Sequence, residues 1–124
     1  MKWILAWWAA VLIVAGFAFP VRADLSEAEA RAQLKRGALV VDVRTVKEYQ
    51  AGHLTNTVNI PLAELKEKLP ALATNKSDVV LLHCASGQRS RTAERELRAL
   101  GYTNAFNIGS FTQARKLLTT AEPK

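Results

Sequence analysis

Cysteine is nearly absent from this sequence of 124 residues, because Cys84 is the only one. A lone cysteine excludes an internal disulfide, although exported proteins normally use their cysteines in pairs. Histidine is almost as scarce, with only His53 and His83, whereas a protein metal centre needs three or four such ligands together. We therefore expect no metal and no cofactor, and the single thiol needs its own explanation.

Acidic residues are missing from the start of the chain, up to Ala23. Residues 3–19 form an uncharged run of 17 residues, and Val21 and Ala23 then provide the small side chains that a signal peptidase accepts. We expect residues 1–23 to be a removed signal peptide and residues 24–124 to be one domain, periplasmic and without stable membrane contact. The alternative is an uncleaved membrane anchor through residues 3–19, since the run is just short of a typical span of about 20 residues.

Basic residues outnumber acidic ones only modestly once the leader is removed. Two of the 17 basic residues lie in the predicted leader, so 15 remain against 11 acidic residues and the net charge is about +4. The two signs are mixed along the chain, without an arginine-rich tail, which argues against a nucleic-acid surface and favours small anions as partners. We also expect a monomer, because no long apolar stripe remains on the surface after the core helices are assigned.

Apolar, β-branched segments alternate with helical ones through the mature chain. The predicted strands are residues 38–43, 57–60, 78–83 and 104–108. The predicted helices are residues 28–35, 45–52, 62–72, 91–101 and 112–118. Ser26 with Glu29 is a capping box, and Gly37 is a typical helix stop. The alternation predicts an α/β three-layer sandwich around a mainly parallel sheet, with the very apolar strand 78–83 in its centre.

Cys84 directly follows that central strand, at the edge of the sheet where α/β proteins bind ligands. A buried cysteine at a strand end is often only a small hydrophobe. Here, however, a short flexible loop leads into a helix expected to begin near Ser90, so backbone N–H groups can turn inward around the sulfur. The helix terminus and the charge of Arg89 should lower the pKa of the thiol, which favours a nucleophile. The predicted anion cradle consists of Ala85, Ser86, Gly87, Gln88, Arg89 and Ser90.

Two motifs, "DVRTVKEYQAGHLTNTVNIPL" and "CASGQRS", together resemble the rhodanese family of sulfurtransferases, in particular its small exported single-domain members of the phage-shock type. The resemblance implies a rhodanese-like fold in which Cys84 takes a sulfane sulfur from a donor such as thiosulfate. It also implies a persulfide on Cys84 that passes its sulfur to cyanide or a thiol. Phosphatases of related architecture have one residue more than the four between Cys84 and Arg89, so the cradle resembles the sulfur-handling one. The alternative is a non-catalytic persulfide carrier or sulfur-binding module for a partner protein.

The remaining motif residues have structural interpretations beside the catalytic ones. We expect Asp42, Arg44 and Glu48 to form a buried ion-pair network that fixes the first strand, with Arg44 able to reach the cleft. His53 is a candidate for support of the cleft. We do not assign it as an acid or base, because a persulfide relay needs neither if the cradle stabilises both the thiolate and the persulfide. His83 should point away from the cysteine into the core. Phe111 stands after Gly109 and Ser110, where many family members have a second glycine and then a tryptophan, so its role is open.

Overall fold

The computed structural model describes residues 25–121, and the predicted signal peptide lies outside this range. Its sheet has four strands, all paired in parallel, in the order β2-β1-β3-β4. These are β1 (Leu39–Asp42), β2 (Val58–Asn59), β3 (Val80–His83) and β4 (Ala105–Gly109). β3 is buried along its whole length between β1 and β4, as its apolar sequence predicted. No helix within residues 25–121 is long and apolar enough to cross a membrane.

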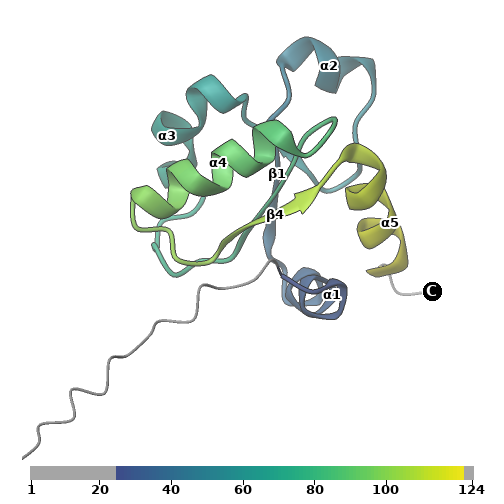
Figure 1. The fold of residues 1–124 in the computed structure, drawn as a ribbon, viewed down its shortest axis with the longest axis horizontal. Coiled ribbons are helices and arrows are strands. Elements are labelled where there is room, and N and C mark those ends of the chain that lie inside the picture. Colours follow the sequence, from purple (N-terminus) through teal and green to yellow (C-terminus); the bar gives the residue numbers. More distant parts are fainter. Residues whose placement is uncertain (1–24, 122–124) are drawn as a thin grey trace, which may run out of the picture.

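Helices cover both faces of the sheet, so the predicted three-layer α/β sandwich is confirmed (Figure 1). The α-helices are α1 (Glu27–Lys35), α2 (Val46–Ala51), α3 (Leu65–Lys68), α4 (Gln88–Ala99) and α5 (Phe111–Ala121). One core lies between the sheet and α3 with α4, and includes Leu65, Leu82 and Leu97. The second lies between the sheet and α1 with α5, and includes Leu81 and Leu117. In Figure 1, α2 stands apart from both layers, beyond the carboxyl ends of the strands.

Local capping signals fix the beginnings of α1 and α2. The Ser26 side chain accepts from the Glu29 N–H while Glu29 accepts from the Ser26 N–H, which is the predicted capping box. Thr45 and Glu48 form the same arrangement at the start of α2. Gly37 follows α1 with φ of 84°, in the left-handed region where glycine is favoured.

The segment 62–72 differs from the single helix that its apolar spacing predicted. It consists of a 3-10 turn (Leu62–Glu64), the short α3 and a second 3-10 turn (Leu69–Ala71). Pro70 has no N–H to continue an α-helical hydrogen-bond ladder, so the helix cannot run through this position. Leu65 and Leu69 nevertheless point into the core, as the spacing indicated.

The start of α4 also differs from the prediction. The helix begins at Gln88, so Gln88, Arg89 and Ser90 form its first turn instead of closing a loop. Gly87 precedes it with φ of 94°, and no side-chain oxygen caps the helix. The Cys84 sulfur accepts the N–H of Gly87 at 3.0 Å, so this donor at the start of the helix is paired.

The outer edge of β4 is covered by two side chains from α4. The Glu94 carboxylate accepts the N–H of Asn107 at 2.5 Å, and Arg98 Nε donates to the carbonyl of Ala105 at 3.1 Å. Glu94 and Arg98 also approach each other to 3.8 Å. Backbone groups that a neighbouring strand would otherwise bind are therefore satisfied within the chain.

Candidate active site

Cys84 lies immediately after β3, where the chain turns toward α4. Its side chain is fully buried, and its N–H donates to the carbonyl of Gly109 at 3.3 Å, which ties it to the end of β4. The cysteine therefore stands at the carboxyl edge of the parallel sheet, as its sequence position predicted.

Hydrogen-bond donors surround the Cys84 sulfur. The Gly87 N–H lies 3.0 Å from Sγ and the Ser90 hydroxyl lies 3.4 Å from it. Burial alone raises the pKa of the Cys84 thiol, but the Ser90 hydroxyl and the N–H groups of Ser90, Gly87 and Ser86 outweigh it and leave this pKa below its ordinary value. Ser86, Gly87 and Ser90 of the predicted loop thus place donors at the sulfur, and these donors favour a thiolate.

The backbone conformation at position 87 favours glycine. Its φ of 94° is unfavourable for residues with a side chain. A Cβ atom there would also lie 3.4 Å from the carbonyl carbon of Gly109 and 3.5 Å from the Ser110 nitrogen. The loop therefore packs closely against the end of β4, which holds the Gly87 N–H at the sulfur.

Arg89 does not point freely at an anion, contrary to the sequence prediction. Its NH1 and NH2 groups donate to the two carboxylate oxygens of Glu48 at 2.6 and 2.9 Å. The bond from Arg89 lowers the pKa of Glu48 to about 2, and Glu48 in turn raises the pKa of Arg89. The hydroxyl and amide groups around Cys84 are the main contributors to the lowered thiol pKa.

The buried ion pair next to the site contains Asp42 and Arg44 but not Glu48, which corrects the predicted three-residue network. Arg44 Nε and NH2 donate to the Asp42 carboxylate at 2.7 to 3.0 Å, and NH2 also donates to the carbonyl of Gly52 at 2.9 Å. Glu48 lies in the first turn of α2, where its carboxylate meets Arg89.

Phe111 forms part of the wall beside the cysteine loop. The Arg44 guanidinium lies over the Phe111 ring, 4.8 Å from its centroid. The backbone N–H of Phe111 donates to the carbonyl of Ala85 at 3.1 Å. These two contacts answer the question of the role of Phe111, which the sequence left open. Its backbone holds the loop while its ring supports Arg44.

The two histidines occupy different environments. His53 is exposed and stacks on Tyr49, with ring centroids 3.9 Å apart, while its Nδ1 lies 3.0 Å from the Tyr49 carbonyl. His83 is fully buried, as predicted, but it also contacts the backbone of Cys84, because its Nδ1 lies 3.3 Å from the Cys84 carbonyl. Sequence reasoning missed this contact, although the position of His83 beside Cys84 was a signal.

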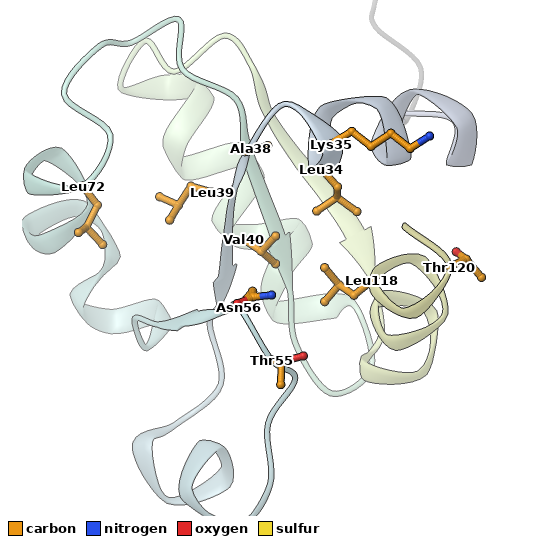
Figure 2. Close-up of a pocket in the computed structure, with 11 residues that line it drawn as sticks. Leu34, Lys35, Ala38, Leu39, Val40, Thr55, Asn56, Leu72, Leu118 and Thr120 are labelled. Carbon is orange, nitrogen blue, oxygen red and sulfur yellow. The ribbon is translucent and has the colours of Figure 1, made fainter. Parts of the chain in front are cut away.

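One hollow of the surface lies away from the cysteine loop. A cavity of about 960 Å³ opens near the amino end of β1, with Leu34, Leu39, Val40 and Leu118 in its walls (Figure 2). Its lining includes no residue of the cysteine loop. Within residues 25–121, no group of three or more His, Cys, Asp or Glu side chains could hold a metal ion.

Known proteins resemble this chain in sequence and in fold. Thiosulfate sulfurtransferase PspE of Escherichia coli strain K12 is 38% identical over 69 residues, which cover 56% of this chain and 66% of PspE, just under two thirds. Uncharacterized protein YqhL of Bacillus subtilis is 34% identical over 100 residues, or 79% of this chain and 77% of YqhL. The solved structure of the human single-domain sulfurtransferase TSTD1 is similar with a TM-score of 0.64 and 29% identity, covering 77% of this chain and 96% of TSTD1. Because the Rhodanese-like domain family also matches residues 26–116, this chain belongs to the rhodanese-like family.

Proposed function

We propose that the protein is a sulfurtransferase that moves a sulfane sulfur from thiosulfate, or a similar anionic donor, to cyanide or a thiol. Cys84 is the proposed nucleophile, and residues 85–90 bind the donor. The observation that carries the proposal is the set of donors at the Cys84 sulfur, the Gly87 N–H at 3.0 Å and the Ser90 hydroxyl at 3.4 Å. These contacts favour a thiolate, which is the nucleophilic form of cysteine. The similarity to PspE, which is named a thiosulfate sulfurtransferase, supports the same activity.

The first half-reaction transfers sulfur to the protein. The Cys84 thiolate attacks the outer sulfur of thiosulfate, a new sulfur–sulfur bond forms, and the bond within thiosulfate breaks. The electron pair of the broken bond leaves with sulfite. Charges balance, because a thiolate and a dianion give a persulfide anion and a dianion. No proton moves, so no general base is needed, and the exposed His53 has no required part in the step.

The second half-reaction returns the cysteine to its starting state. Cyanide, or a thiolate acceptor, attacks the outer sulfur of the persulfide, and the bond to Cys84 Sγ breaks. Thiocyanate, or a new persulfide, departs, while the electron pair stays on Sγ. The donors from Gly87 and Ser90 stabilise this leaving thiolate as they stabilise the attacking one.

Intact-mass spectrometry of the protein before and after thiosulfate tests the proposal. We expect a gain of about 32 Da from one persulfide sulfur, and its loss on addition of cyanide. Cys84→Ser should show neither the gain nor thiosulfate:cyanide transfer, because a hydroxyl near its free pKa cannot replace a thiolate. Substantial transfer by Cys84→Ser would refute the assignment.

A second candidate function is a persulfide carrier that holds sulfur for a partner protein. The full burial of Cys84 favours it, because a sulfur held there is shielded from the solvent and can be stored. The same mass measurement separates the two functions. A sulfur that small acceptors discharge indicates turnover, and one that stays through repeated acceptor additions indicates storage.

We also propose that the protein works in the periplasm after removal of residues 1–23. The uncharged run at residues 3–19 and the small residues Val21 and Ala23 support this proposal. N-terminal sequencing of the protein from cell fractions tests it, with Asp24 expected as the first residue. A chain that keeps its leader in the membrane fraction would support the anchor instead.

A further inference from the structure

One buried polar atom next to the proposed nucleophile has no hydrogen-bond partner. His83 is fully buried at the end of β3, and its Nε2 is unpartnered among the residues that the structure describes. Buried polar groups are nearly always paired, and an unpaired one costs about 1–3 kcal/mol. The unpaired Nε2 therefore points to a use of His83 other than stability.

The contacts of His83 determine which of its ring nitrogens carries the hydrogen. Nδ1 lies 3.3 Å from the Cys84 carbonyl, which can only accept, so Nδ1 is the donor. Nε2 then carries a lone pair, and it faces Asp42 Oδ2, a second acceptor, at 3.7 Å. Burial lowers the pKa of His83 in spite of Asp42, whose charge is paired with Arg44, so the ring stays neutral. The imidazole thus donates from Nδ1 to the Cys84 carbonyl, and its Nε2 is left without a hydrogen-bond partner.

A second contact holds the next peptide of the loop in the same way. The Phe111 N–H donates to the carbonyl of Ala85 at 3.1 Å. The described peptides are all trans, and in a trans peptide the C=O and the following N–H point in opposite directions. Holding the Ala85 carbonyl on the Phe111 side therefore turns the Ser86 N–H toward the sulfur, where it helps to lower the pKa of Cys84.

We propose that His83 is a positioning residue for the thiolate cradle, because its Nδ1–H holds the Cys84 carbonyl and thereby fixes the first peptide of the loop. His83 and the Phe111 N–H act on consecutive carbonyls, so the loop leaves β3 in one defined orientation. The Gly87 N–H and the Ser90 hydroxyl then meet the sulfur without rearrangement. The inference rests on the proposed function in one respect, that a reactive thiolate at Cys84 serves sulfur transfer.

The test compares two variants of His83 through the alkylation of Cys84, which is the only thiol in the chain. His83→Asn keeps an N–H donor at the same distance from Cβ as Nδ1, and His83→Leu removes the donor while filling the space. The rate of reaction with iodoacetamide is measured from about pH 5 to about pH 10, because only the thiolate reacts. Thermal unfolding of each variant provides the measure of stability.

At pH values below both thiol pKa values, we expect His83→Leu to react about tenfold more slowly than the wild-type protein, as for a thiol pKa raised by one unit. At high pH, where every thiol is ionised, the rates should converge, which excludes a change in access. His83→Asn should stay within about twofold at every pH. His83→Leu removes the unpaired Nε2 but also leaves the Cys84 carbonyl without its donor, so the two effects oppose each other and the net change in thermal stability should be small. This separation of reactivity from stability is the signature of a positioning role.

The inference is overturned if both variants keep the pH profile of the unmodified protein, or if both lose it alike. Should His83→Leu not fold, His83→Gln serves as the contrast, because its amide lies one bond farther from Cβ and should restore the profile less well than His83→Asn. Alkylation does not depend on sulfur transfer. If the alkylation profile depends on the His83 donor but the protein transfers no sulfur from thiosulfate, the proposed function is refuted and this inference stands. If the protein transfers sulfur but the profile does not depend on His83, the proposed function stands and this inference is refuted.

Discussion

Glu48 and Arg89 form a two-point ion pair across 41 positions of sequence, with oxygen–nitrogen distances of 2.6 and 2.9 Å. The pair joins the first turn of α2 to the first turn of α4, directly beside the cysteine loop. Each side chain keeps somewhat more than a third of its surface exposed. The one guanidinium that the sequence assigned to donor binding is therefore neutralised at rest but can be reached from solvent.

Glu48→Gln should strengthen the binding of thiosulfate. The substitution removes the carboxylate that neutralises Arg89, so the guanidinium becomes free to attract the anionic donor. We expect the KM for thiosulfate to fall severalfold at low salt and the difference to shrink at high salt, because exposed charges are screened. Steady-state kinetics at two ionic strengths measure this. Glu64→Gln, which removes an equal charge from the exposed pair with Lys68, is the matched control. A raised KM in Glu48→Gln would mean that the pair matters more for shaping the loop than for neutralising charge.

Arg89→Ala should weaken thiosulfate binding for the converse reason, because it leaves the Glu48 carboxylate unpaired beside the site. The loss should be smaller than the ~1.5–3 kcal/mol of an uncompensated charge-assisted contact, since the partly exposed charge is already neutralised. The double substitution Arg89→Ala with Glu48→Gln should recover much of the loss in KM. Arg91→Ala serves as the control, because Arg91 is exposed and lies two residues further along the same helix. An unchanged KM in Arg89→Ala would show that backbone amides and the Ser90 hydroxyl suffice.

Ser90→Ala should raise the pKa of the Cys84 thiol. The Ser90 hydroxyl bonds to Sγ at 3.4 Å and is the strongest of the groups that lower this pKa. A thiol with a lowered pKa loses its thiolate only as the pH falls through that value, so in Ser90→Ala the loss should begin at higher pH. We expect a shift of about one unit, measured by the pH dependence of alkylation. Ser86→Ala is the control, because Ser86 acts through its N–H, which alanine retains. Equal profiles for both variants would contradict the assigned role of the hydroxyl.

Asp42→Ala should strongly destabilise the fold. Asp42 is fully buried, and its loss leaves the nearly buried Arg44 guanidinium without its counter-charge. Breaking a buried pair in this way typically costs about 3–5 kcal/mol, which denaturant unfolding would measure. Asp42→Leu combined with Arg44→Met should be far less destabilised, because no buried charge remains. Glu27→Ala, in an exposed pair with Arg31, should change stability by less than about 0.5 kcal/mol, and a similar small effect of Asp42→Ala would contradict the argument.

Features that depend on neighbouring residues were predictable from the sequence. The capping box of Ser26 with Glu29 and the stop at Gly37 use contacts within one helical turn, so their residue types are sufficient signals. The central place of β3 followed from its apolar run, and the edge position of Cys84 followed from that of β3.

Features that depend on distant residues were not predictable in the same way. The sequence suggested Arg44 as the natural neighbour of Glu48, but the turn of α2 brings the carboxylate to Arg89 instead. The early start of α4 carried no side-chain capping signal, because the residue before the helix is Gly87 and no side-chain oxygen caps it. The bond from His83 to Cys84 depends on the rotation of a buried ring, which no sequence pattern encodes.

The covering of β4 by Glu94 and Arg98 affects how readily the protein aggregates at high concentration. An open parallel sheet with a bare outer strand is a template to which a strand of another molecule can add. Here a carboxylate and a guanidinium occupy the N–H of Asn107 and the carbonyl of Ala105, so an incoming strand would have to displace charged groups from a helix that also packs on the core. At the opposite margin, β2 has only two residues. Neither margin, within residues 25–121, offers the long bare edge on which fibrous aggregation starts.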